Sequence, residues 1–275
     1  AMKPRAAAWL VSAAGALAVL APARAGADEP LWELGAGLAA VRLPHYRGSD
    51  QSRGWLLPLP YAVYRGEIFR ADRNGARAVL LDRAGVDLDV SAAATAPTRS
   101  RDDRARAGMP DLAPTLELGP NLNLTLARGA AWQLQLRLPV RAVFTAQRSP
   151  QAIGATFSPV LNLDLRAAGW NLGFQGGPLA ASRAYHAYFY DVAPAYASAD
   201  RPAYRAGGGA GGWHLGASAS RRFGAWWLGG YVRADSVAGA AFEPSPLVRQ
   251  RGNLSLGLAL SRILAVSDER VADRR

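Results

Sequence analysis

The sequence predicts an all-β fold, a transmembrane antiparallel β-barrel of about 12 strands, with 10 strands as the alternative. First, apolar and polar residues alternate along many segments, and this is the period of a strand with one apolar face. In segment 132–144, for example, leucines fall on one face and glutamines and arginines on the other. Second, short and long connectors alternate, as in outer-membrane barrels. Third, the tryptophans after residue 25 lie near the ends of predicted strands, as in aromatic girdles at both membrane interfaces.

The twelve predicted strands are separated by turn and loop residues. The split between the third and the fourth depends on Asn74-Gly75, a strong signal for a hairpin turn. Without that turn the count becomes eleven and the alternation of connector lengths is lost. Prolines inside the predicted strands, such as Pro58 and Pro159, remove a ladder donor and predict bulges or shorter strands. The predicted strands are 31–41, 54–64, 67–72, 76–81, 86–93, 112–126, 131–144, 155–166, 169–180, 212–222, 225–235 and 252–263.

The connectors assign the two ends of the barrel. The short connectors belong to the periplasmic end and the long ones to the outside, and the even strand number places both termini in the periplasm. The longest connector, 181–211, is rich in aromatic residues. It is either a binding surface or a loop that folds inward and packs the barrel mouth.

The composition excludes several other classes of protein. The 275 residues contain no Cys, so disulfide scaffolds, thiol enzymes and cysteine metal sites are excluded. The three histidines, His45, His186 and His214, lie far apart and not in a metal-ligand spacing. No segment after residue 25 is long and apolar enough for a membrane helix. We therefore expect no catalytic residue, no cofactor and no metal site.

Residues 1–25 read as a cleaved signal peptide. Lys3 and Arg5 precede the uncharged stretch 6–23, and Ala23-Arg24-Ala25 fits an A-x-A cleavage site. A membrane anchor is the alternative. Cleavage would remove three basic residues and lower the formal net charge from +11 to +8. The barrel is then expected over 26–264, and the charged C-terminal tail, 265–275, is expected to be disordered or an atypical end.

The polar faces of the predicted strands send charges into the barrel lumen. Equal numbers of carboxylates and arginines predict a paired network, because buried ions are stable only when paired and hydrogen-bonded. A weaker alternative is an embedded enzyme that uses His214 and Ser218 of one strand, but no G-x-S-x-G motif occurs. The predicted network comprises Asp87, Asp89, Glu117, Asp164, Asp235, Arg137, Arg141, Arg166, Arg222 and Arg233.

Seven segments together resemble the MipA/OmpV family of Gram-negative outer-membrane proteins. The resemblance covers about residues 31–262 and depends on the order and spacing of the segments. The chain departs from the usual pattern of such barrels in its last strand, which lacks a final aromatic residue, and in the added tail. The segments are PHYRGSD at 44–50, PLPYAVYRG at 58–66, DLAPTLELGP at 111–120, WNLGFQGGPL at 170–179, YHAYFYDVAP at 185–194, SRRFG at 220–224 and AGAAFEPSPLV at 238–248.

This resemblance implies export to the outer membrane and suggests a partner. The best-known member of the family joins a lytic murein transglycosylase to a bifunctional penicillin-binding protein, and other members are porin-like or adhesive. We therefore expect a non-catalytic scaffold for murein (peptidoglycan) hydrolase and synthase, with a narrow porin-like diffusion channel or a surface adhesin as the alternative. Lipid and lipopolysaccharide are the expected surroundings, and an exported barrel will not meet nucleic acid.

A scaffold would present its partner surface on the short periplasmic turns. Several of these turns carry arginine, the side chain best suited to bidentate contacts with carboxylates. The alternative is that these arginines bind lipid phosphates of the inner leaflet. The candidate partner surface consists of Arg65, Arg83, Arg128 and Arg221.

Overall fold

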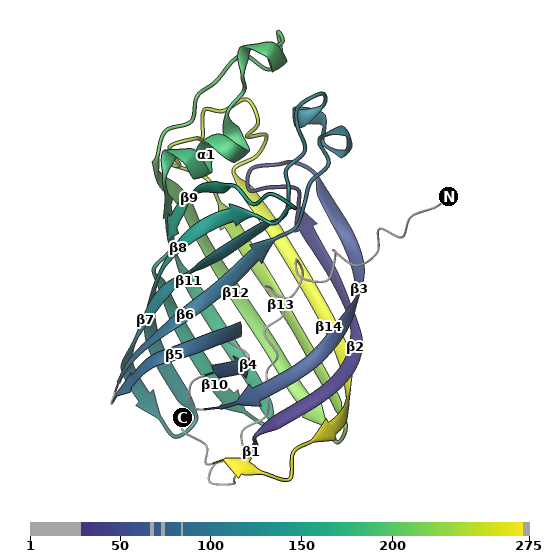
Figure 1. Ribbon diagram of the computed structural model, residues 1–275, viewed down its shortest axis with the longest axis vertical. Helices are drawn as coiled ribbons and strands as arrows, with labels where there is room; N and C mark the ends of the chain where they lie inside the picture. Colours follow the sequence, from purple (N-terminus) through teal and green to yellow (C-terminus); the bar gives the residue numbers. More distant parts are fainter. Residues whose placement is uncertain (1–28, 67–68, 73–74, 84, 272–275) are drawn as a thin grey trace.

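The structure is a computed structural model that describes residues 29–66, 69–72, 75–83 and 85–271. The predicted signal peptide lies outside the described residues. Most of the described chain forms long tilted strands arranged around a barrel, with loops gathered at one end (Figure 1). All strand pairs are antiparallel. The predicted fold class, an antiparallel β-barrel, is therefore confirmed.

Thirteen strand segments of the described chain form the barrel sheet. Where Ala168 and Gly169 connect two of them, both residues have positive φ, 49° and 78°, as a two-residue hairpin turn requires. The segments are β2 (Trp32–Pro44), β3 (Ser52–Arg65), β4 (Phe69–Asp72), β5 (Gly75–Arg83), β6 (Val86–Thr95), β7 (Thr115–Gly129), β8 (Trp132–Thr145), β9 (Ala152–Phe157), β10 (Val160–Ala167), β11 (Trp170–Ala181), β12 (Gly209–Phe223), β13 (Trp226–Ser236) and β14 (Gly252–Val266).

The pairings run around the barrel as a ring. β14 pairs with β2 from Leu256↔Arg42 to Val266↔Glu33, so the last long strand lies beside the first. Between β3 and β4, the described residues form two register pairs, Tyr64↔Ala71 and Arg65↔Arg70. β4 and β5 form a short pair that ends at Asp72↔Gly75, and Asn74 of the predicted hairpin turn lies outside the described residues.

The predicted strand 155–166 consists of two segments, β9 and β10. Both pair with β8 and with β11, so they share one position in the barrel wall and the ring has twelve positions. The interruption contains Pro159, which has no N–H to give to the ladder. The Pro159 carbonyl approaches Gly177 of β11 so closely that a Cβ there would clash. Pro159 therefore shortens the strand, as the sequence suggests, without removing a strand from the wall.

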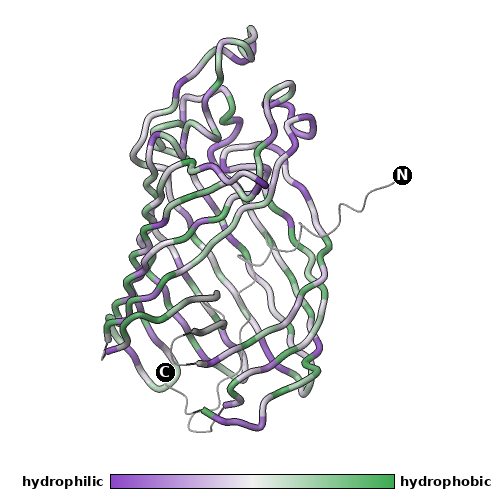
Figure 2. Tube along the Cα trace, in the orientation of Figure 1, coloured by the Kyte–Doolittle hydropathy of each residue, from purple (hydrophilic) through white to green (hydrophobic). Residues whose placement is uncertain are grey.

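The two faces of the wall differ as the alternation predicts. Leucines such as Leu256 and Leu258 point outward and are 42% and 59% exposed, whereas Asn253 and Ser255 on the same strand are buried inside. The alternation of apolar and polar residues is visible along the strands in Figure 2. The outward apolar face is what a barrel wall in contact with lipid needs.

The predicted aromatic girdle is only partly correct. Trp132, Trp213 and Trp226 lie on the outer face and are more than two-fifths exposed. Trp227, however, is 1% exposed and packs against Tyr61 inside the barrel, with ring centroids 5.9 Å apart. Consecutive strand residues must face opposite sides, so Trp226 and Trp227 cannot both belong to the girdle. Trp55 also packs against the apolar cluster inside the barrel.

At the end with the long connectors, the loops fold over the barrel mouth (Figure 1). The loop between β11 and β12 contains the helix α1 (Arg183–Tyr190) and the 3-10 helix η3 (Pro194–Tyr196). The loop between β6 and β7 contains the 3-10 helices η1 (Ser100–Asp102) and η2 (Arg104–Arg106). Within the described residues, no helix is long and apolar enough to span a bilayer.

At the opposite end, the two ends of the described chain meet. β1 (Glu29–Pro30) pairs with β15 (Arg270–Val271). The Ser267 hydroxyl donates to the Glu269 carbonyl at 2.7 Å and accepts from the Trp32 N–H at 3.3 Å. The expectation of a disordered tail is therefore wrong as far as Val271, because the main chain finds hydrogen-bond partners there.

Candidate functional site

A buried carboxylate, Glu33 of β2, joins three strands near the end that carries the short turns. Its Oε1 accepts from Arg65 Nη2 at 2.9 Å and its Oε2 accepts from Arg222 Nη1 at 3.0 Å. The Tyr61 hydroxyl also donates to Oε2, at 3.4 Å. Glu33 is 1% exposed, so its charge is stabilised inside the protein by two guanidinium groups. The predicted lumen set lacks Glu33, although it stands between two apolar residues in the same alternating pattern as the others.

The assignment of Arg65 to the partner surface is wrong. Its guanidinium forms a further ion pair with Glu29 and donates to the Pro30 carbonyl at 2.8 Å. Arg65 follows the buried residues Tyr61 and Val63 at intervals of two, so it belongs to the inner face of β3. The side chain is held by two carboxylates and a carbonyl and is not available to a partner.

One wall of the lumen carries a ladder of hydrogen-bonded polar side chains. Asp89 of β6 is buried and accepts from Asn121 at 3.3 Å and from Asn123 at 2.8 Å, both on β7. Arg141 of β8 donates to the Ser91 hydroxyl at 3.0 and 3.1 Å. Amides and hydroxyls, which the predicted charge network omits, are therefore the hydrogen-bond partners of the charged groups on this wall.

The remaining predicted carboxylates also have partners in the lumen. Glu117 accepts from the Thr156 hydroxyl at 3.3 Å and interacts electrostatically with Arg141. Asp164 accepts from the Asn162 amide at 2.9 Å and lies 3.6 Å from Arg137 Nη2. Asp87 lies half-buried on β6, opposite Asn123 of β7.

Asp235 anchors the lumen to the loops above it. It pairs with Arg233 of its own strand at 2.9 Å and with Arg47 Nε at 3.0 Å. Arg47 comes from the loop between β2 and β3 and also donates to the carbonyls of Gly211, Trp213 and Ser236. The sequence gives no signal for this contact, because Arg47 lies in a loop whose path depends on the assembled barrel.

The other residues of the predicted sets lie near the short turns. Arg166 lies half-buried on β10, and no carboxylate of the described chain pairs with it. Arg83 and Arg128 are exposed at their turns. Arg221 is half-buried and lies over the Phe223 ring, 4.9 Å from its centroid, so it is engaged with the outer girdle.

A hollow with a volume of about 440 Å³ lies beside these turns. We name it the turn-end hollow. Its size is in the range of small-ligand sites. It is lined by Arg128, Gly129, Ala130, Ala131, Trp132, Gln133, Asp164 and Arg166.

At the opposite end, side chains from four of the long loops, including the loop that contains α1, form an apolar core, which we name the loop core. Tyr190 of α1 stacks on Phe242 with centroids 3.6 Å apart. The Tyr46 hydroxyl donates to the Leu247 carbonyl and the Tyr190 hydroxyl to the Arg47 carbonyl, both at 2.8 Å. The loop core consists of Tyr46, Leu112, Tyr190, Val192, Ala206, Val237, Ala240, Phe242 and Leu247. Of the two alternatives for the aromatic loop, inward packing is what the structure shows.

Burial in and around the loop core shifts several ionisation equilibria. Burial raises the pKa of the Tyr46 and Tyr190 hydroxyls and lowers the pKa of Arg106. It also lowers the pKa of His186, whose Nδ1 lies 2.8 Å from the Gly207 carbonyl. Burial removes water from each group and therefore disfavours its charged form. The charged form is the deprotonated one in tyrosine, so the pKa rises. It is the protonated one in arginine and histidine, so the pKa falls.

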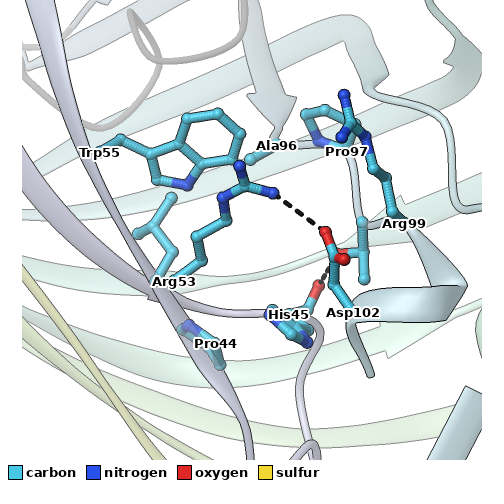
Figure 3. Close-up of a pocket in the computed structure, with 10 residues that line it drawn as sticks. Pro44, His45, Arg53, Trp55, Ala96, Pro97, Arg99 and Asp102 are labelled. Atoms are coloured by element: carbon cyan, nitrogen blue, oxygen red, sulfur yellow. Dashed lines mark hydrogen bonds and ion pairs between the residues drawn. The ribbon is translucent and has the colours of Figure 1, made fainter. Parts of the chain in front are cut away.

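Asp103 connects two of the long loops, the one between β2 and β3 and the one between β6 and β7. Its carboxylate accepts from the Ser49 hydroxyl at 2.8 Å and lies 2.9 Å from His45 Nδ1. Close by, Arg53 of β3 lies over the Trp55 ring and donates to Asp102 at 3.2 Å (Figure 3). The pocket drawn there has a volume of only about 20 Å³, which is room for a single water.

The geometry offers little for catalysis. His214 and Ser218 are four residues apart on β12, about 13 Å along a strand, which is too far for a nucleophile and its base. In the described chain, no group of three His, Asp or Glu residues is placed to hold a metal ion. The arrangement pairs charges inside the barrel and packs the long loops against one another at one end.

Comparison with known proteins gives distant structural likenesses. No curated protein matches the chain significantly. Among solved structures, a bacterial polysaccharide outer membrane secretin is 9% identical, covers 87% of this chain and 100% of its own, and has a TM-score of 0.41. An outer membrane channel from Pseudomonas putida F1 is 14% identical, covers 91% of this chain and 98% of its own, and has a TM-score of 0.40.

The family comparison is more informative. The model of the family described as MltA-interacting protein MipA matches residues 36–264, from the first long strand almost to the end of the last. This range contains the predicted lumen charges, the loop core and the turn-end hollow, and Glu33 lies just before it. With an apolar outer wall, a closed ring of antiparallel strands and this match, the chain is an outer-membrane β-barrel protein and belongs to the MltA-interacting protein MipA family.

Proposed function

We propose that the protein is a non-catalytic scaffold in the outer membrane of a Gram-negative cell. It presents its short turns to murein enzymes in the periplasm, with a lytic murein transglycosylase as the first partner and a bifunctional penicillin-binding protein as the second. The observation that carries the proposal is the loop core, because a barrel whose outer mouth is packed with apolar side chains is poorly suited to conduct solutes. The family description, which names an interaction with MltA, supports the choice of partner.

The loop core is held by hydrogen bonds between loops as well as by apolar contacts. Arg106 Nη1 donates to the Phe189 carbonyl at 2.9 Å, which ties η2 to α1. Arg201 Nη1 donates to the carbonyls of Ala105 and Ala107 at 3.0 and 2.9 Å. Ser245 Oγ donates to the Tyr190 carbonyl at 2.8 Å. Opening the mouth would break several of these contacts at once, which favours a permanently closed end.

The end with the short turns, in contrast to the apolar loop core, exposes charged side chains. Arg83 and Arg128 extend from their turns with exposed side chains, and Arg221 lies nearby over an aromatic ring. Guanidinium groups bind carboxylates in a bidentate manner, so these turns suit an acidic surface on a partner. Arg65 is excluded from this surface because Glu29 and Glu33 hold it. The alternative, that Arg221 binds lipid phosphate, is favoured for this one residue by its position over Phe223.

Affinity capture tests the proposal. The mature protein is used to capture proteins from solubilised envelopes, and the bound murein enzymes are identified and quantified. Charge reversal at Arg83, Arg128 and Arg221 together should abolish their capture while heat-modifiable migration of the barrel on gels remains. The matched control is Arg262→Glu, a reversal at the same end on the outer face, where Arg262 lies over Trp226. Equal capture by the wild-type protein and the triple variant would contradict the proposal.

A narrow channel is the second candidate, and the turn-end hollow favours it. Polar side chains continue from this hollow into the lumen, which is the lining that a water-filled path needs. A surface adhesin is supported less, because Tyr190 and Phe242 of the outer loops are buried in the loop core. Ion conductance through the wild-type barrel, with no captured partner, would favour the channel.

A further inference from the structure

We propose that the turn-end hollow is a binding site for a short peptide that carries two carboxylates. Two guanidinium groups without acceptors, from Arg128 and Arg166, line a cavity of small-ligand size. The inference relies on the proposed function only for the compartment, the periplasm, in which murein presents short acidic peptides.

The strand register places the polar lining of the hollow in one row. Arg128 lies opposite Gln133, and Gln133 lies opposite Asp164. Arg166 follows Asp164 by two residues on β10, so it shares the same lumen face, one step nearer the end of the strand. The Arg166 N–H donates to the Ala131 carbonyl at 2.8 Å, which fixes β10 against the turn between β7 and β8. The hollow is therefore built on paired strands and one tight turn.

Charge in the hollow is unbalanced. Elsewhere in the lumen, Arg137 pairs with Asp164, Arg222 with Glu33 and Arg233 with Asp235. In contrast, the guanidinium groups of Arg128 and Arg166 have no hydrogen bond or ion pair within the described residues. Asp164 does not neutralise them, because Arg137 and Asn162 already engage its carboxylate. An anionic ligand would supply the missing acceptors.

The positions of the two arginines indicate the class of ligand. A guanidinium fork binds a carboxylate through two parallel N–H donors, so two forks fit two carboxylates of one molecule. Gln133 Nε2 donates to the Thr125 hydroxyl at 3.1 Å, which leaves its second N–H and its carbonyl oxygen for a peptide bond. Trp132 completes the lining beside the turn. A phospholipid headgroup fits less well, because Gln133, Asp164 and Arg166 face the lumen rather than the lipid.

Calorimetric titration of the refolded mature protein in detergent tests the site. The probe is N-acetyl-alanyl-γ-D-glutamyl-lysine, which has two free carboxylates, and its diamide is the control ligand. We expect the peptide to bind and the diamide not to bind. Arg128→Gln and Arg166→Gln should each weaken binding by about tenfold or more, since each removes a charge-assisted fork. Arg262→Gln, at the same end but on the outer face, should bind as the wild type does.

Three results would overturn the proposal: binding of the diamide with equal affinity, unchanged binding by Arg166→Gln, or displacement of the peptide by equimolar inorganic phosphate or by phospholipid vesicles. If Arg166→Gln does not show heat-modifiable migration, Arg166→Lys replaces it. That variant keeps the charge but loses the fork, so it should bind with intermediate affinity, and wild-type affinity would contradict the site. Capture of murein enzymes by the Arg166 variants should be unchanged, so failure of peptide binding and failure of the scaffold are distinguishable.

Discussion

Glu33 and Arg222 are 189 residues apart in the sequence, yet Glu33 Oε2 lies 3.0 Å from Arg222 Nη1 inside the barrel. The pair connects β2 with β12, two strands that are separated in the wall by β13 and β14. Arg65 reaches the same carboxylate from β3. The strands that close the barrel are therefore joined by side chains across its interior as well as by the backbone ladder.

Replacing Glu33 tests this interior connection. Glu33→Gln leaves two guanidinium groups without their shared carboxylate, and such a loss in a buried site costs about 3 kcal/mol. Urea unfolding of the refolded barrel, followed by its heat-modifiable gel shift, measures the change. Asp268→Asn removes an exposed carboxylate at the same end and should have almost no effect. A similar loss of stability in both variants would contradict the role of the pair.

The outward face of the wall is expected to lie in lipid. Leu136→Arg and Leu256→Arg should each cost about 2–4 kcal/mol if the residue lies near the midplane, because a charge then enters the hydrocarbon region. Gln135→Arg, one residue away on the lumen face, should cost much less. Unfolding free energies in lipid vesicles provide the comparison. If all three substitutions lower the unfolding free energy equally, the assignment of these residues to the lipid and lumen faces is wrong.

His186 should make the loop core sensitive to acid. Burial lowers its pKa below the ordinary 6.5, so the unfolded loop binds a proton at a higher pH than the folded loop does. The loop core is therefore fully stable above about pH 6.5 and loses stability as the pH falls below that value. Near-UV circular dichroism melts from about pH 8 to about pH 5 should show this loss in the wild type.

The variant His186→Gln provides the control for this experiment. Glutamine can donate to the Gly207 carbonyl but does not become protonated in this range. Its melting temperature should depend much less on pH. The same acid response in both proteins would show that another group is responsible.

The long loop between β11 and β12 should lie outside the cell. Ala199 is exposed at its tip, between Ser198 and Arg201, whose backbones pair with each other. A tag inserted there should be labelled on intact cells, whereas a tag at Gly224 in a short turn should be labelled only after the outer membrane is broken. The reverse pattern would invert the topology.

Much of the barrel could be predicted because lipid and lumen impose a period of two on the sequence. Leu254, Leu256 and Leu258 show their orientation directly, since a strand alternates its side chains. The same rule limits the predicted aromatic girdle, because Trp226 and Trp227 must face opposite sides of the wall. Pro159 signalled an interruption, but only the pairing of β9 and β10 with the same two neighbours shows that they share one position.

The candidate sites could be predicted less completely. The sequence places carboxylates and arginines on the lumen face, but the pairing partners depend on register around the barrel. Arg47 reaches Asp235 from a loop, a contact that leaves no local pattern. The period of two places Arg65 and Glu33 on the inner face, but it does not show that they pair. The turn-end hollow depends on the closure of β7, β8 and β10 around a turn, which no single segment reveals.

Single-channel recording in planar bilayers tests the central claim most directly, namely that the loops close the barrel. If the loop core around Tyr190 and Phe242 closes the barrel as we propose, the wild-type protein should show no stable conductance steps. A variant in which 183–207 is replaced by a short Gly-Ser linker should show them, provided that its heat-modifiable migration is intact. Regular conductance steps from the wild-type protein, of the same size as those from the variant, would contradict a closed scaffold.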